Sequence, residues 1–262
     1  MPKQFLFILL LLTALLTGPA VAAPPLDEII RRANNVSYYN GDDGRSEVSM
    51  TITDSQGRIR NRLFTILRKD VEDGGNQFFF VYFKRPSDVR KTTFLVHKNM
   101  ERDDDRWMYL PDLDLVKRIA ASDKRTSFVG SDYFYEDVSG RNINADHHEL
   151  TTEDDTYYVV KNTPKKPDDV EFSSYTVWID KNNFMPMQAE YTAKNGEVYR
   201  TMEVLAMETI QGHPTVTTSR ISDLATGSNT VTEFRNIKYN IDLSRDIFSE
   251  RYLRRPPREA RQ

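Results

Sequence analysis

The feature that most constrains the fold of this chain is a two-residue alternation of apolar and polar side chains. It begins in Ser46–Ile52, where apolar side chains occupy every second position from Val48 onward. Successive side chains of a β-strand point to opposite faces, so this period predicts a strand with one buried face. The turn formers Asp54-Ser55-Gln56-Gly57 separate it from a second segment, Arg58–Arg68. We therefore predict a hairpin.

More segments of this kind follow, each separated from the next by turn formers. Gln77–Lys84 is apolar on both faces, so we expect both faces to be covered or one face to line a cavity. The others are Thr92–Lys98, Arg106–Leu110, Leu115–Ile119, Asp155–Lys161, Ser174–Asp180, Met185–Thr192, Val198–Met207, Thr215–Ile221 and Thr230–Tyr239. Roughly a dozen strands with little helix predict a mainly β protein, whose large antiparallel sheet curls into a barrel, half-barrel or sandwich.

Helix is predicted in few places. Pro25–Ala33 has apolar residues at helical spacing and acids before bases, which indicates a short amphipathic helix. Weaker helical patterns occur at Ser131–Glu136 and Asp146–Leu150.

The first 22 residues have the three-part pattern of a secretory signal peptide. Lys3 precedes an apolar run from Phe5 to Leu16, and small residues indicate cleavage before Ala23. The run is too short to span a bilayer, which needs about 20 residues. We therefore predict export to the periplasm by a cleaved signal.

Composition limits the remaining possibilities. With 0 Cys the exported chain has no disulfide, so its stability must come from a core. The 36 basic and 39 acidic residues give a net charge of −3, which implies no nucleic-acid partner. We expect one domain over residues 23–253 and a flexible basic tail over residues 254–262, which is rich in proline and arginine.

Sequence signals for chemistry are weak. The chain has no G-x-S-x-G elbow and no glycine-rich phosphate loop. The adjacent residues Asp146 to Glu149 cannot converge easily on a metal, because neighbours on a strand or helix point apart. The acids in residues 101–105 lack the rest of a calcium loop. We therefore predict no catalytic residue, no metal and no cofactor.

The most specific patterns lie between Tyr82 and Asp137, with one more near Trp178. They are Phe83-Lys84-Arg85-Pro86-Ser87-Asp88, Arg106-Trp107-Met108-Tyr109-Leu110-Pro111, Val116-Lys117-Arg118-Ile119, Gly130-Ser131-Asp132-Tyr133 and Tyr175-Thr176-Val177-Trp178-Ile179-Asp180. In order and spacing they resemble the LolA-like family of outer-membrane lipoprotein-sorting proteins. The resemblance implies a half-barrel closed by short helices, with an apolar cavity that takes acyl chains in the periplasm. It also implies work with an inner-membrane exporter of the resistance-nodulation-division type.

An apolar cavity needs only shape and apolar walls, because each buried methylene contributes about 0.8 kcal/mol. The predicted walls are Val48, Met50, Ile52, Leu63, Leu67, Phe79, Val81, Phe83, Leu95, Met108 and Leu110. On the third strand the opposite face is nearly as good a candidate for the cavity wall; it carries Phe78, Phe80 and Tyr82. A gate at the mouth is predicted from Tyr133, Phe134 and Tyr135. Each of these residues would serve equally well in an ordinary core.

Two functional hypotheses of different classes follow. The first is a monomeric periplasmic carrier or accessory protein that binds a lipid or lipoprotein acyl chain and touches the membrane transiently. The second is a ligand-free adaptor that docks onto a membrane exporter. An envelope hydrolase would need carboxylates or histidines that converge in the fold.

Overall fold

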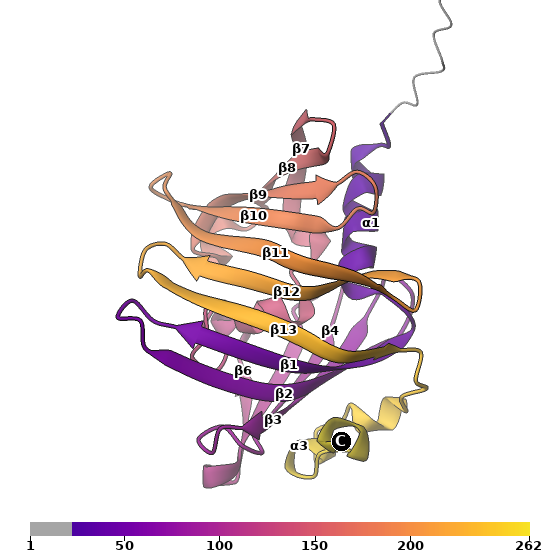
Figure 1. Cartoon of the computed structure of the whole chain (residues 1–262), viewed down its shortest axis with the longest axis vertical. Coiled ribbons are helices and arrows are strands. Elements are labelled where there is room, and N and C mark those ends of the chain that lie inside the picture. Colours follow the sequence, from indigo (N-terminus) through magenta and orange to yellow (C-terminus); the bar gives the residue numbers. More distant parts are fainter. Residues whose placement is uncertain (1–22) are drawn as a thin grey trace, which may run out of the picture.

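A computed structural model describes residues 23–262; the predicted signal peptide, residues 1–22, lies outside the described residues. Thirteen antiparallel strands form one sheet in the order β6-β5-β4-β3-β2-β1-β13-β12-β11-β10-β9-β8-β7 (Figure 1). The strands are β1 Asp43–Thr53, β2 Ile59–Asp70, β3 Gln77–Arg85, β4 Thr93–Lys98, β5 Asp105–Leu110, β6 Leu115–Ile119, β7 Asp146–Glu153, β8 Tyr157–Pro164, β9 Phe172–Asp180, β10 Pro186–Ala193, β11 Val198–Ile210, β12 His213–Asp223 and β13 Ser228–Tyr239. The mainly β fold predicted from the alternation is confirmed.

The strand order determines what closes the sheet. The first strand, β1, pairs with both β2 and β13, so the chain runs outward to β6 and returns from the opposite edge at β7. Residues 120–145 connect these two edges and cross the concave face of the sheet. We call residues 120–145 the cover segment; it contains α2, Tyr135–Ser139, and the short 3-10 helices Ala121–Asp123 and Ile143–Ala145.

Helix α1, Leu26–Tyr38, covers another part of the concave face (Figure 1). Its acidic first turn favours the helix dipole, and Ile29 and Ala33 are buried against strand residues such as Val160 and Ile179. Arg68 on β2 holds the end of this helix, since its guanidinium donates hydrogen bonds to the Tyr38 carbonyl and, at 2.6 Å, to the Asn40 carbonyl.

The convex face is covered by the chain that follows β13. It forms a 3-10 turn, Arg245–Ile247, then α3, Arg251–Arg254, and α4, Arg258–Arg261. Leu253 and Ala260 are fully buried in a cluster with Leu67, Phe80 and Leu95. Residues 254–262 are therefore packed, unlike the flexible tail that their composition suggests, because Ala260 and Pro257 provide a buried side between the exposed arginines.

One local prediction was wrong. Asp146–Leu150 belongs to β7 and is not helical, because its backbone pairs with β8 from Asp146↔Pro164 onward. The other weak helical pattern, Ser131–Glu136, overlaps α2, which begins only at Tyr135. The segments that were predicted as strands agree with the structure to within a few residues at their ends.

Candidate functional site

A cavity of about 470 Å³ lies between the concave face of the sheet, helix α1 and the cover segment. Strands β1–β3 and β7–β13 all contribute side chains to it, so the curl of the sheet forms the cavity wall. This volume falls within the range of about 300–1,000 Å³ that is usual for small-molecule sites.

Most of the wall is apolar. Side chains from both halves of the sheet take part: Val48, Met50, Phe64, Ile66, Phe79, Val81, Val160, Val177, Ile179, Ala189, Met202, Val204, Val216, Ile221, Phe234 and Ile237. They face inward because directly paired residues of neighbouring strands share a face, as Val48↔Phe64, Ile66↔Val81 and Val48↔Phe234 do. A continuous wall of this kind can hold an apolar chain by excluding water.

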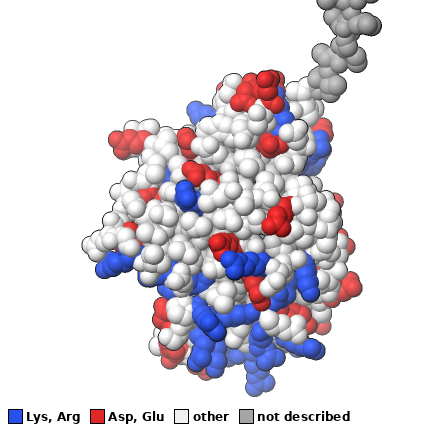
Figure 2. All heavy atoms as spheres, viewed as in Figure 1, with Lys and Arg blue, Asp and Glu red and all other residues white. Residues whose placement is uncertain are grey.

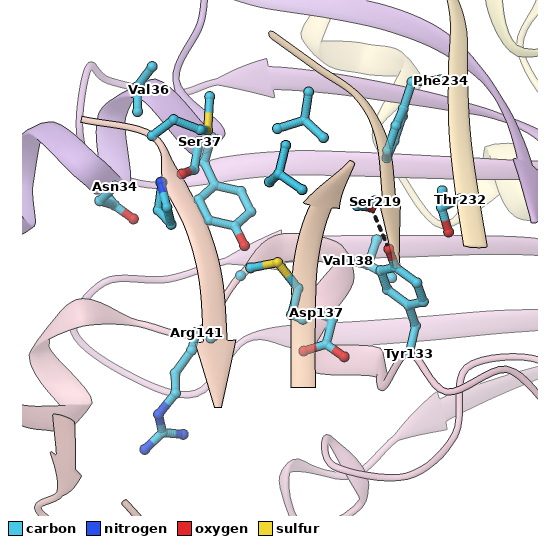
Figure 3. A pocket seen from close by; sticks show the side chains of 18 of the residues that line it. Asn34, Val36, Ser37, Tyr133, Asp137, Val138, Arg141, Ser219, Thr232 and Phe234 are labelled. Atoms are coloured by element: carbon cyan, nitrogen blue, oxygen red, sulfur yellow. Dashed lines mark hydrogen bonds between the residues drawn. The ribbon is translucent and has the colours of Figure 1, made fainter. Parts of the chain in front are cut away.

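A small group of polar side chains lies where the cover segment meets the sheet (Figure 3). The hydroxyl of Tyr133 lies 2.9 Å from the Ser219 Oγ atom on β12, and Thr232 of β13 lies nearby. Burial raises the pKa of Tyr133, so the phenol stays protonated at neutral pH. These hydroxyls give the cavity a polar end beside its apolar wall.

Ion pairs attach the cover segment to the sheet beside the cavity. The Nη2 atom of Arg200 on β11 donates to Asp137 Oδ2 at 2.5 Å and to the Asp132 carbonyl at 3.2 Å. Burial acts to lower the pKa of Arg200, but the Asp137 carboxylate raises it overall, so the guanidinium stays charged. Asp132 also accepts a hydrogen bond from the Thr230 hydroxyl of β13, at 2.6 Å.

A second set of buried charges continues this attachment toward the β7 edge. Arg125 lies 3.1 Å from Glu136, and Arg141 lies 3.2 Å from the other oxygen of the same carboxylate. Arg141 also pairs with Asp146 at 2.8 Å, and Asp146 accepts the Tyr175 hydroxyl at the same distance. These contacts connect the cover segment to β7 and β9, so the cover is held from several directions.

Of the predicted wall residues, Val48, Met50, Phe79 and Val81 line the cavity. Phe83, Met108 and Leu110 belong to the same apolar cluster but lie where Phe128 of the cover segment fills the concave side; the rings of Phe83 and Phe128 are 5.7 Å apart. Ile52 is buried on β1 beyond the residues that line the cavity. The concave side is thus packed at one end and hollow at the other.

The prediction placed Leu63, Leu67 and Leu95 on the cavity side, and the structure corrects this. Leu67 and Leu95 are fully buried in the cluster on the convex face, and Leu63 is half-buried on the Leu67 side of β2. The cavity side of β2 carries Phe64, Ile66 and Arg68 instead. Both faces of β2 are apolar because both are covered, so alternation alone could not select the inner one.

The predicted gate residues separate into three positions. Tyr133 lines the cavity. Phe134 lies just before α2, and the guanidinium of Arg200 lies 4.5 Å from the centre of its ring. Tyr135 packs against Phe94 and Phe128 in the filled end of the core.

The sequence analysis missed the whole contribution of β8–β13, together with Arg200 and Asp137. Val177 and Ile179, like Met202 and Val204, are apolar residues two positions apart, and this spacing was a usable signal for the apolar wall of the cavity. The ion pair had no such signal, because Arg200 and Asp137 lie 63 positions apart in the chain.

Residues 23–262 contain no group of three or more His, Asp or Glu side chains placed to hold a metal ion. His148 instead contacts the Asn162 side chain and the Ile143 carbonyl, and Arg141 pairs with Asp146. Over the same residues no helix has the length and apolar character needed to cross a bilayer.

Comparison with known proteins identifies the family. The model of a family described as an uncharacterized protein matches residues 75–255. A DUF1329 family protein from Desulfovibrio piger is 30% identical, with a TM-score of 0.80 over 86% of this chain and 96% of that chain. No curated protein matches the sequence.

Two further structures have the same fold. A domain assigned by its description to outer-membrane lipoprotein sorting, from Vibrio parahaemolyticus, is 24% identical, with a TM-score of 0.79 over 87% of this chain and 97% of that chain. A LolA superfamily protein from Nitrosomonas europaea is 20% identical, with a TM-score of 0.68 over 88% and 100%. The chain therefore belongs to the DUF1329 family and has the LolA-like fold of the outer-membrane lipoprotein-sorting proteins.

Proposed function

We propose that this protein is a periplasmic carrier that binds the acyl chain of a lipid or lipoprotein in the cavity of its half-barrel. The observation that supports this most directly is the apolar cavity of about 470 Å³, which both halves of the sheet line and the cover segment closes. The polar end at Tyr133 and Ser219 suits an amphiphile, whose head would lie there while its chain contacts the apolar wall.

The energetics of such binding need no catalytic group. About ten methylenes transferred from water into the cavity would contribute roughly 8 kcal/mol before the costs of ordering the chain. Apolar burial imposes no directional requirement on the chain, so we expect the protein to accept a class of lipids. Met50 and Met202 lie in the wall, and their flexible side chains can adapt to different guests.

The cellular setting of the proposal comes from the family and from the N-terminal sequence. The LolA-like fold supports a carrier. The signal-peptide pattern of residues 1–22 supports the periplasm as the site of action. An inner-membrane exporter of the resistance-nodulation-division type is the partner that the resemblance implies, and crosslinking from the protein surface in intact cells would detect it.

Lipid analysis of the protein purified from its native envelope tests the carrier function. We expect mass spectrometry of an organic extract to find acyl lipid in stoichiometric amount. We also expect the delipidated protein to bind a fluorescent fatty acid in a titration that reaches saturation. A protein that carries no extractable lipid and does not bind the fluorescent fatty acid would refute the proposal. A crosslinked exporter together with an empty cavity would favour the adaptor hypothesis.

A further inference from the structure

The chain after β13 presents a basic surface on the convex side of the molecule. Six exposed arginines project from this segment; they are Arg245, Arg251, Arg254, Arg255, Arg258 and Arg261. We call these six residues the arginine face. Figure 2 shows Lys and Arg side chains gathered at the lower end of the molecule, where Figure 1 places α3 and the C-terminal residue.

The packing of the segment explains why these arginines point outward. Leu253 and Ala260 are fully buried against the convex face, and Pro257 is buried between them. The contacts of α3 with β4 and β5 hold the segment in place. The arginines are thus displayed from a fixed backbone rather than from a loose tail.

The charges of the arginine face are largely unpaired. Within residues 23–262, Arg254 is the one member whose guanidinium lies within 4.0 Å of a carboxylate, at 2.9 Å from Asp114. Only Asp246, Glu250 and Glu259 oppose six arginines in residues 245–262, whereas the whole chain has a net charge of −3. A positive surface on a net negative protein indicates a partner with concentrated negative charge.

Two exposed apolar side chains lie beside the contact that Arg254 makes with Asp114. Leu113 and Leu115 are 69% and 45% exposed, and they flank Asp114 in the chain. Arg254 holds this turn, since its Nη2 atom donates to the Asp114 carbonyl at 3.1 Å in addition to the ion pair. Arg254 thus links the arginine face to two exposed leucines, and basic and apolar side chains together are the combination that binds lipid–water interfaces.

We propose that the arginine face, with Leu113 and Leu115, docks the protein onto a membrane surface rich in anionic phospholipid. Guanidinium groups bind phosphate oxygens with paired hydrogen bonds, and the leucines would enter the region just below the headgroups. The two leucines favour a membrane over an acidic protein, because they lie beside the charges and not in a groove that a peptide would fill. This surface is separate from the cavity, so its role does not depend on the identity or presence of cargo.

Vesicle co-sedimentation of the purified protein tests the proposal. Vesicles of phosphatidylcholine with phosphatidylglycerol are compared with vesicles of phosphatidylcholine alone, at low salt and at about 0.5 M salt, where charges are screened within a few ångströms. The variant carries Arg251→Gln, Arg255→Gln, Arg258→Gln and Arg261→Gln. The matched control carries Arg31→Gln, Lys161→Gln, Lys166→Gln and Lys194→Gln, which are exposed cations on α1 and around β8–β11.

We expect the native protein to bind the anionic vesicles at low salt and to be released at high salt. The arginine variant should bind about tenfold more weakly or worse, whereas the control, with the same change in net charge, should bind like the native protein. Leu113→Asn with Leu115→Asn should weaken binding severalfold and leave part of the salt dependence. Unchanged thermal unfolding of each variant shows that the fold is intact.

Two outcomes would overturn the proposal. One is that the native protein does not sediment with anionic vesicles. This outcome counts against the proposal also when the arginine face crosslinks to an acidic protein. The other is equal loss of binding in the arginine variant and in the control, which would mean that overall charge, and not this surface, governs the interaction. Neither outcome affects the test of lipid in the cavity.

Discussion

Arg200 on β11 and Asp137 in α2 form a buried ion pair with a separation of 2.5 Å between Nη2 and Oδ2. The side chain of Arg200 is only 3% exposed, and its Nε atom has no hydrogen-bond partner among the described residues. The pair attaches the cover segment to the half of the sheet that follows it in the chain. Both residues line the cavity, although they lie 63 positions apart in the sequence.

Replacing Arg200 with methionine should destabilise the protein strongly. The substitution leaves the partly buried Asp137 carboxylate with Arg125 at 4.0 Å as its nearest remaining cation, so we expect a loss of about 2–3 kcal/mol, below that for a fully unpaired buried charge. Urea denaturation measures the loss in the free energy of unfolding. Arg220→Gln is the matched control, because Arg220 and Glu203 form an exposed pair at 3.6 Å that should contribute less than about 1 kcal/mol. Equal losses in the two variants would contradict the role of the buried pair.

Filling the cavity should weaken lipid binding without unfolding the protein. Ala189 on β10 is buried and lines the cavity, so Ala189→Phe places a ring in the space that a chain would occupy. We expect the affinity for a fluorescent fatty acid to fall by about tenfold, since a packed interior cannot hold both groups. Leu205→Phe, at an exposed position on β11, is the control and should leave the affinity unchanged. Full binding by the Ala189→Phe protein would show that lipid binds elsewhere.

Lys98 should give the protein a distinct dependence on alkaline pH. Burial lowers the pKa of Lys98 from its ordinary 10.5 to about 8, although the amine still donates to the Ser139 carbonyl at 2.8 Å. Between pH 8 and 10 the unfolded chain holds more protons at this residue than the native protein, so raising the pH stabilises the native state.

We therefore expect the free energy of unfolding of the native protein, relative to that of Lys98→Met, to rise across this window. Urea denaturation at several values between pH 7 and pH 10 measures it, with the exposed Lys194→Met as the control. A difference between native and Lys98→Met that stays constant with pH would exclude a lowered pKa at Lys98.

Ala260 should matter for stability although it lies near the end of the chain. Its side chain is fully buried against Leu67 and Leu95, so Ala260→Asp forces an unpaired carboxylate into an apolar cluster. We expect a loss of about 2–3 kcal/mol in the free energy of unfolding. Arg261→Ala, at the exposed neighbouring position, should change it by no more than about 0.5 kcal/mol. No difference between the two variants would mean that residues 254–262 do not pack in solution.

The predictions from sequence failed at particular residues for identifiable reasons. Val48 and Met50 were placed correctly on the cavity side because β1 is polar on its other face. Leu67 and Leu95 were placed on the wrong face because Phe64, Ile66, Phe94 and Val96 make the opposite face equally apolar. Residues 243–260 cover the convex face over Leu67 and Leu95. They lie far from these strands in the chain, so the strand sequences gave no sign that this face would be buried.

The sequence by itself determined the mainly β class and every strand except β7, because alternation and turn chemistry act between neighbouring residues. It also carried the family resemblance, since the motif residues are local. Only the tertiary structure decided which apolar face lines the cavity, where the cover segment fills it, and which arginine holds that cover. These features depend on pairs such as Arg200 with Asp137, which the strand order brings together and which no local pattern records.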